Sequence, residues 1–223
     1  WNGITYDSSG TYFSYSDTNN SYSMSFDGID DNLNMGYLNT YNLNDLTLSF
    51  DVKLDSSDFN EGVEILGQNG FLGEDWFGVR YQEPSSQNSN NSLFVLRRYK
   101  QNYGYDVMIP FELEVNKWTN IIINYSLNSS LVKVYVNGTF VAQDNCSLPL
   151  FVNNSDNPFE IGANTVDIQN GYTTFFNGNI DNLFILNKSL DSNEINYYST
   201  CITFFNDSNI VAFWNFEEGS GNI

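Results

Sequence analysis

Two short segments near opposite ends of the chain have the composition of a cation site. Residues 26–31 read FDGIDD and residues 176–181 read FNGNID, so each places glycine beside carboxylates or amides. Glycine lets the backbone turn sharply enough for its carbonyl to point inward, and Asp and Asn supply the hard oxygen ligands that calcium prefers. The segments therefore predict a calcium site. The other interpretation is that these side chains only cap turns.

A second set of candidates consists of aromatic and arginine residues in predicted loops and strands. Tyr and Trp flank sugar sites because the ring face stacks while the polar tip bonds hydroxyls, and Arg offers several fixed donors. The predicted ligand-binding residues are Trp76, Arg80, Tyr99 and Tyr103. Strand alternation places Arg97 and Arg98 on opposite faces, so at most one of them joins Arg80. The rival interpretation of the arginines is a cross-strand ion pair with an Asp or Glu. Other aromatic residues, such as Trp118 and Phe184, are expected in the core.

The residue types exclude several classes of enzyme. The chain contains no histidine, which excludes Ser-His-Asp and Cys-His catalysis and His-ligated metals. The nearest approach to a catalytic carboxylate pair is Glu112 with Glu114, or Glu217 with Glu218. We interpret both pairs as solvated acids. The sequence therefore predicts a protein that is not an enzyme, with a glycoside hydrolase as the minor alternative.

The charge balance restricts the partners. The chain has 223 residues, of which 27 are acidic and 8 basic, and its net charge is −19. It cannot neutralise a phosphate backbone, so nucleic acid is excluded, and anionic lipid is disfavoured. No run approaches the ~18 apolar residues of a membrane span. The acidic surface suits a calcium-rich exterior, with solubility alone as the alternative.

Short apolar runs broken by Asn, Ser, Gly and Asp clusters predict many strands in one β-sandwich spanning residues 1–223. The predicted strands are Tyr22–Phe26, Leu46–Leu54, Val63–Gly67, Phe77–Gln82, Leu93–Tyr99, Asp106–Phe111, Trp118–Ser126, Leu131–Val136, Thr139–Gln143, Phe159–Gly162, Gly178–Leu186 and Ile210–Phe216. Between two of them, Asn137-Gly138 predicts a tight hairpin, because both turn residues need positive φ. Asp191 and Glu194 predict a capping box and one short helix near the C-terminus.

Cysteines and glycosylation sequons bear on the compartment. Cys146 and Cys201 are the only cysteines; we expect a disulfide between them, and two buried thiols are the alternative. Asn-x-Ser/Thr sequons favour surface loops of an exported glycoprotein, although an Asn-rich chain also produces them by chance. They begin at Asn19, Asn90, Asn124, Asn128, Asn137, Asn145, Asn153, Asn187 and Asn206.

Four motifs carry a family resemblance: residues 26–31, Lys117-Trp118-Thr119, the 134–138 hairpin and residues 176–181. Together they resemble a laminin-G-like, pentraxin-type domain of the concanavalin A-like lectin/glucanase superfamily. The resemblance covers the chain from Ser21 to Glu194. It implies an all-β fold, a two-sheet antiparallel jelly-roll sandwich. This chain lacks the Glu-x-Asp strand that carries the acids of the glucanases in that superfamily.

The same resemblance implies a calcium ion (Ca2+) where the early Asp-Gly turn meets the final Ile-Asp strand. Its ligands would be the carbonyl of Gly28 and the side chain of Asp181. Three further acids, Asp27, Asp30 and Asp31, are nearby ligand candidates.

The chain ends leave three interpretations open. Residues 209–221 resemble the opening strand of a laminin-G-like repeat, and residues 6–10 resemble the turn that follows such a strand. Residues 210–223 are therefore either the closing strand of this domain, the start of a following tandem repeat, or a strand exchanged with a neighbour.

The combined expectation is a non-catalytic, calcium-binding adhesion or carbohydrate-recognition module, extracellular or at the cell surface, within a larger surface protein. Its partner would be a glycan or a surface protein. The alternative from another class is a structural subunit or repeat of a cell-surface or virion filament, assembled from copies of the chain by strand exchange. Superfold membership alone does not decide between these functions.

Overall fold

Alternation of apolar and polar residues along β3 (Asp45–Leu54) illustrates how the strands form. Leu48, Phe50 and Val52 are fully buried on one face, because successive side chains of a strand lie on opposite faces. In β9 (Leu131–Val136) every second residue is likewise buried. The computed structural model describes residues 21–38, 43–56, 62–68, 76–82, 93–100, 103–145, 158–165, 174–200 and 207–217.

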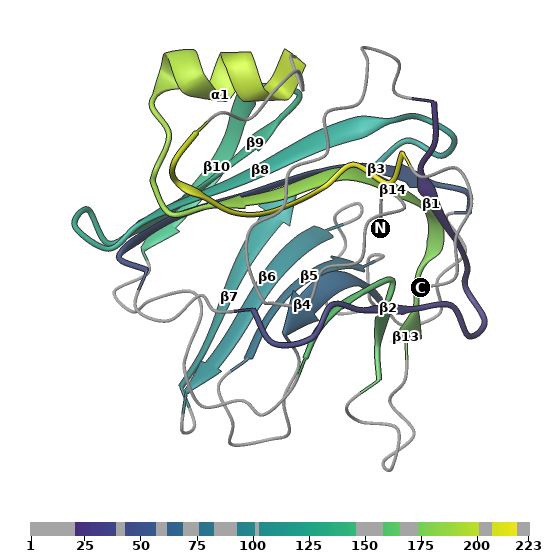
Figure 1. The fold of residues 1–223 in the computed structure, drawn as a ribbon. Coiled ribbons are helices and arrows are strands. Elements are labelled where there is room, and N and C mark those ends of the chain that lie inside the picture. Colours follow the sequence, from purple (N-terminus) through teal and green to yellow (C-terminus); the bar gives the residue numbers. More distant parts are fainter. Residues whose placement is uncertain are drawn as a thin grey trace.

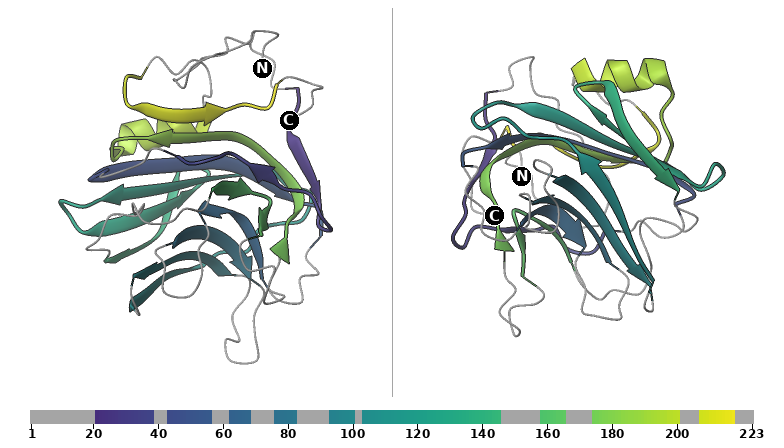
Figure 2. Two further views of the ribbon diagram at one scale, coloured as in Figure 1. Left: turned by 60° about the horizontal axis from the view of Figure 1, so that its bottom comes forward. Right: turned by 180° about the vertical axis from the view of Figure 1, so that it is seen from behind.

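The strands form two antiparallel sheets that face one another (Figures 1 and 2). We call the first sheet A; its order is β1-β14-β3-β8-β9-β10, and β15 also pairs with β14. Its other strands are β1 (Met24–Asp27), β14 (Asn177–Leu186), β8 (Thr119–Ser126), β10 (Thr139–Asn145) and β15 (Ile210–Trp214).

The second sheet, sheet B, has the order β2-β11-β4-β5-β6-β7. Its strands are β2 (Leu33–Asn34), β11 (Phe159–Ile161), β4 (Val63–Gln68), β5 (Trp76–Gln82), β6 (Leu93–Lys100) and β7 (Tyr103–Pro110). A small pair, β12 (Ala163–Asn164) with β13 (Thr174–Phe175), lies beside β4. The predicted two-sheet antiparallel jelly-roll sandwich is confirmed.

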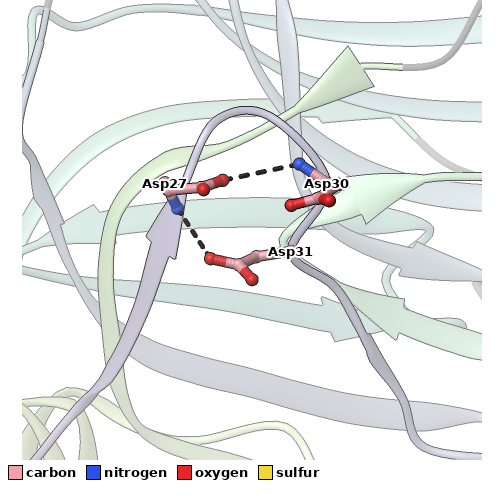
Figure 3. A group of neighbouring side chains, drawn as sticks. All are labelled: Asp27, Asp30 and Asp31. Carbon is pink, nitrogen blue, oxygen red and sulfur yellow. Dashed lines mark hydrogen bonds between the residues drawn. The ribbon is translucent and has the colours of Figure 1, made fainter.

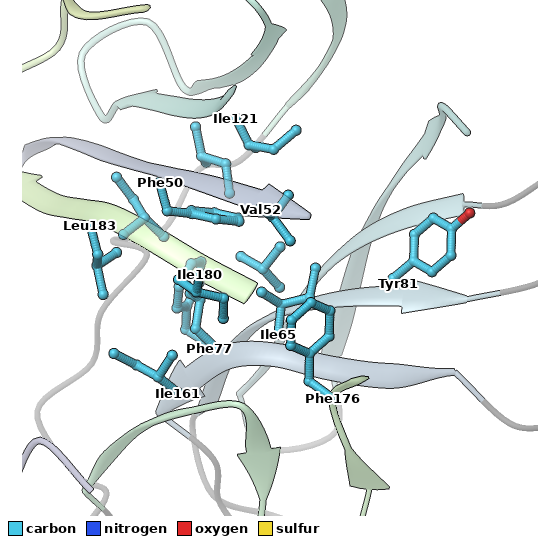
Figure 4. Close-up of a cluster of buried hydrophobic side chains, with 14 of the residues drawn as sticks. Phe50, Val52, Ile65, Phe77, Tyr81, Ile121, Ile161, Phe176, Ile180 and Leu183 are labelled. Carbon is cyan, nitrogen blue, oxygen red and sulfur yellow. The ribbon is translucent and has the colours of Figure 1, made fainter. Parts of the chain in front are cut away.

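The main core lies between the sheets (Figure 4). Phe50, Ile121 and Ile180 enter it from sheet A, and Ile65 and Phe77 enter it from sheet B. All five are at most 1% exposed. Burial of this aromatic and aliphatic surface is the main force that holds the two layers together.

A smaller apolar cluster lies on the outer face of sheet A, where α1 (Ser192–Thr200) packs (Figure 1). Ile195 and Tyr198 of the helix contact Phe184 and its neighbours, so Phe184 is buried as expected. The predicted capping box is confirmed: Asp191 Oδ1 accepts the N–H groups of Asn193 and Glu194 at 2.8 and 2.9 Å, and Glu194 Oε2 accepts the Asp191 N–H.

The predicted hairpin joins β9 and β10, and both turn residues have positive φ, 48° at Asn137 and 74° at Gly138. At the other end of the sheet, β15 pairs with β14 of the same chain. Glu217 then accepts the N–H groups of Ser21 and Tyr22, which lead into β1. In this structure β15 therefore extends sheet A beside β14.

Candidate functional site

One row of residues crosses sheet B and combines charged residues with two glycines. The strand register pairs Glu160 with Gly67, Gly67 with Gly78, Gly78 with Arg97, and Arg97 with Asp106. Residues directly opposite one another on paired strands share a face. Gly67 and Gly78 are both buried, and a Cβ on Gly67 would lie 2.5 Å from the backbone oxygen of Phe77, so glycine permits close packing at the centre of the row.

The row lies on the outer face of sheet B, away from the core. In β5, Phe77, Val79 and Tyr81 are core residues with at most 1% exposure. The residues between them, Gly78 and Arg80, must therefore lie on the opposite, outer face. No helix of the described residues packs on this sheet; α1 lies on sheet A (Figure 2).

Register brings three of the four predicted ligand-binding residues to this outer face. Trp76 precedes Gly78 by two positions in β5 and pairs with Tyr99 of β6, while Arg80 follows Gly78 by two positions. Tyr103 pairs with Lys100 and falls on the other face. The alternation argument about the arginines also holds, since Arg97 shares the face of Arg80 and Arg98, the register partner of Phe77, does not.

Two buried glutamates flank Gly67, and sequence reasoning missed both. Glu64 and Glu160 are each 2% exposed. Glu160 Oε2 accepts the Thr165 N–H at 3.0 Å, and its Oε1 accepts the Thr165 hydroxyl and the Asn32 amide. Glu64 Oε1 lies 3.3 Å from the point where a Cβ of Gly67 would be. The available signal was one acid between two large apolar residues in each predicted strand.

The Asp-Gly turn after β1 gathers three carboxylates (Figure 3). Oxygens of Asp27, Asp30 and Asp31 lie within 4.8 Å of one another, and all three residues are exposed. Asp27 Oδ1 accepts the Ile29 N–H at 2.8 Å, and Asp31 Oδ2 accepts the Asp27 N–H at 3.0 Å. These bonds engage one oxygen of the Asp27 carboxylate and one oxygen of the Asp31 carboxylate. Three hard carboxylates held in one turn fit a calcium ion.

Asp181, the second ligand expected from the family resemblance, lies elsewhere. Asp27 pairs with Asn177, whereas Asp181 is four residues further along β14 and pairs with Asp51 of β3. At about 3.3 Å per residue this is roughly 13 Å along the strand. Asp181 is 3% exposed, and its Oδ1 accepts the N–H of Asn182. The structure therefore brings Asp27, Asp30 and Asp31 together but does not bring Asp181 to them.

Beside Asp181, the carboxylate of Asp51 and the amides of Asn120 and Asn182 form a polar cluster that the sequence did not indicate. Burial raises the pKa of Asp51, although amide donors at 2.8 Å from Asn120 and Asn182 oppose the rise. Asn182 has a φ of 49° at a register irregularity in β14. The bulge turns its amide toward Asp51, which fixes this part of the outer face of sheet A.

The remaining candidates divide by position. Cys146, Cys201 and the sequons at Asn19, Asn90, Asn153 and Asn206 lie outside the described residues. Four sequon residues are exposed: Asn128, Asn137, Asn145 and Asn187.

Asn124 is buried, and its amide bonds the backbone N–H and C=O of Leu190 at 2.8 Å. A glycan at Asn124 would have to break these bonds, so we do not expect this sequon to be used in the folded domain. Glu112 and Glu114 are exposed, and Glu114 pairs with Lys117 at 2.7 Å. The described residues contain no helix that is both long enough and apolar enough to cross a membrane.

Comparisons with known proteins agree with this architecture. A laminin G family model, described as the concanavalin A-like lectin/glucanases superfamily, matches residues 26–196. A search of curated proteins found no significant match.

Three solved structures illustrate the similarity. A Bacteroides ovatus protein proposed to bind carbohydrate has 14% identity and a TM-score of 0.66; the match covers 91% of this chain and 54% of that protein, so this chain spans about half its length. The SAP-like pentraxin of Limulus polyphemus has 15% identity, a TM-score of 0.57 and 87% coverage of both chains. A sialidase CBM40 of Ruminococcus gnavus, bound to α2,3-sialyllactose, has 14% identity, a TM-score of 0.56 and coverage of 81% and 97%. At these identities the similarity establishes the fold.

Proposed function

Because this chain belongs to the concanavalin A-like lectin/glucanases superfamily, we propose that it is a non-catalytic carbohydrate-recognition module. We place its ligand on the outer face of sheet B. The observation that carries the proposal is the strand register that places Trp76, Arg80, Arg97 and Tyr99 on this one face. The Ruminococcus gnavus CBM40, which is bound to α2,3-sialyllactose, and the Bacteroides ovatus protein, which is described as carbohydrate binding, support the ligand class.

The chemistry of this face suits sugar hydroxyls. Arginine donates hydrogen bonds to hydroxyl groups, so Arg97 offers donors on this face. The buried Glu64 and Glu160 lie beside Gly67 and support the face from within the fold. Trp76 and Tyr99 are register partners at one end of the face and offer rings for stacking on a pyranose.

Recognition without hydrolysis is the better supported activity. Glu160 is 2% exposed and both of its oxygens accept hydrogen bonds from Thr165, which favours a structural role over a catalytic one. Glu112 and Glu114, the acids of the alternative hydrolase reading, are exposed and lie outside this face. We further propose that the module serves adhesion at the outside of a cell, as part of a larger surface protein, with a glycan or glycosylated protein as partner.

Stacking on sheet B predicts a large loss of binding when its aromatic rings are removed. Trp76→Ala and Tyr99→Ala are each expected to weaken the best ligand from a glycan array at least tenfold, about 1.4 kcal/mol, by isothermal titration calorimetry. The matched control is Tyr103→Ala, which removes an aromatic residue four positions from Tyr99 but on the other face. Thermal melts verify that each variant folds. Wild-type affinity in both Trp76→Ala and Tyr99→Ala would reject sheet B as the site.

We also propose that the Asp27, Asp30 and Asp31 turn binds calcium with a structural role. Since an ion that binds only the native state stabilises it by mass action, calcium should raise the melting temperature and EDTA should lower it.

The Asp31→Asn variant removes one of the three clustered charges and should lose most of that calcium response. Asp144→Asn is the control, because Asp144 is also exposed and also bonds a backbone N–H. Asp181→Asn should keep the response, since Asp181 lies outside the turn. Equal calcium responses in Asp31→Asn and wild type would contradict this site.

A further inference from the structure

The outer face of sheet A carries a second row of accessible polar and aromatic residues. The register pairs Ser25 with Asn179 and Asn179 with Lys53. Pairing of Val52 with Thr119 brings Trp118, the residue before β8, beside Lys53. The Lys53 Nζ lies 5.7 Å from the centroid of the Trp118 ring. The row thus runs across β1, β14, β3 and the start of β8.

The helix leaves this row open. α1 packs further along the sheet, over Ile122 and Phe184. Trp118 is 42% exposed, contrary to the expectation of a core residue. Ser25 is exposed, and Asn179 and Lys53 are half-buried. An indole with this much exposed surface gains free energy when another apolar face covers it.

The neighbours hold the row in place. Lys53 pairs with Asp55 at 3.7 Å, and the Asn179 amide donates to the Ser23 hydroxyl at 3.4 Å. Beside the row, on the same outer face, the amides of Asn120 and Asn182 donate to the Asp51 carboxylate. These contacts orient the Lys53 ammonium beside the Trp118 indole and the Asn179 amide beside the Ser23 hydroxyl, which lowers the side-chain entropy lost on binding.

We propose that the row from Ser25 to Trp118 is a second binding site, which takes a neutral oligosaccharide. Trp118 stacks on one pyranose ring, and Lys53, Asn179 and Ser25 bond the hydroxyls of the following units. The three strand spacings of the row span about 14 Å, roughly the length of a trisaccharide. Lys53, the one cation of this row, is paired with Asp55, and the chain carries a net charge of −19. Anionic sugars are therefore disfavoured.

This site goes beyond the function proposed for sheet B, because it lies on the outer face of the other sheet. Two sites facing away from each other cannot follow one short glycan chain. They can hold two chains, so the module would cross-link a polysaccharide and gain avidity from both faces.

The test is a titration of the intact chain with maltotriose, cellotriose and xylotriose, followed by ¹H–¹⁵N spectra of the tryptophan indoles. The Trp118 resonance, assigned from a Trp118→Phe variant, is expected to shift and saturate with at least one trisaccharide. No shift with any of them up to about 10 mM would overturn the proposal.

Variants separate this site from sheet B. Trp118→Ala is expected to weaken trisaccharide binding at this site at least tenfold, whereas Trp118→Tyr keeps a stacking ring and should retain most of it. Phe140→Ala is the control, because Phe140 is 50% exposed on β10 of the same sheet. Unchanged trisaccharide binding at both sites in Trp118→Ala would overturn the second site. Failure of Trp76→Ala to affect binding would instead reject the sheet B site alone.

Discussion

Replacement of Gly162 by alanine is expected to destabilise the domain by about 3–5 kcal/mol, since overpacking and a left-handed backbone both contribute. Gly162 has a φ of 85°, and its N–H and C=O bond Ile65 and Phe176. A Cβ there would lie 2.2 Å from two ring carbons of Phe26, which is 2% exposed. Phe26 directly precedes Asp27, so the displaced ring would also disturb the carboxylate turn.

The control for this prediction is Gly36→Ala. Gly36 has a similar φ of 70°, but nothing lies within 4 Å of its added Cβ. This variant should lose only about 1–2 kcal/mol, the contribution of the left-handed backbone alone. Urea unfolding of both variants gives the comparison. Equal losses would show that the Phe26 ring moves aside and that the close packing contributes nothing.

The second large effect is expected at a charged cluster that joins α1 to the strands. Lys188 Nζ lies 2.6 Å from Asp207 Oδ2 and 2.8 Å from Glu194 Oε1. The Tyr198 hydroxyl donates to the same Asp207 oxygen at 3.1 Å. The side chains of Lys188 and Asp207 are only 24% and 17% exposed. Asp207→Ala should therefore destabilise the domain by about 2–3 kcal/mol, because a largely buried cation loses its nearest partner.

An exposed pair of similar geometry serves as the control. Lys117 and Glu114 approach to 2.7 Å, but their side chains are 55% and 68% exposed. Removal of Glu114 by Glu114→Ala should change the unfolding free energy by less than about 0.5 kcal/mol. Comparable losses in the two variants would mean that burial does not strengthen the Lys188 cluster.

The same cluster predicts a pH dependence with a defined sign. Burial alone would raise the pKa of Asp207, but hydrogen bonds from Lys188, Asn209 and Tyr198 outweigh it and hold the pKa well below its ordinary range. A depressed carboxyl pKa stabilises the fold above the unfolded value of about 3.9, and this stability is lost as the pH falls. Asp207→Asn should thus flatten the stability profile below about pH 4 relative to wild type.

At alkaline pH the stability that the cluster contributes falls as the pH rises, the reverse of its behaviour in acid. Burial by itself lowers the pKa of Lys188, but hydrogen bonds to Asp207 and Glu194 raise it overall, and burial raises the pKa of Tyr198 to about 12. Raised pKa values stabilise the fold below the unfolded values of about 10, and the contribution is lost at higher pH. Melting curves from neutral pH to about pH 11 measure this loss, and a Tyr198→Phe profile identical to wild type would exclude a contribution from Tyr198.

The sequence by itself determined the elements whose signals are local. The Asn137-Gly138 turn, the Asp191 cap and the alternating strands depend on φ preferences and hydrogen bonds between residues close in the chain. The Asp27-Gly28 turn was found for the same reason, because its carboxylates are neighbours in sequence and bond the backbone of their own turn.

Only the tertiary structure decided which distant residues meet. Glu160, Gly67 and Arg97 converge through the pairing of strands far apart in the chain, and a shift of one residue would move each to the other face. For Asp181, the register of β14 against β1 and β3 set its distance from the turn. Trp118 is exposed because the register places it beside Lys53 on the outer face of sheet A, beyond the part that α1 covers. Register and strand ends arise from the packing of two whole sheets, and a short sequence motif does not contain that information.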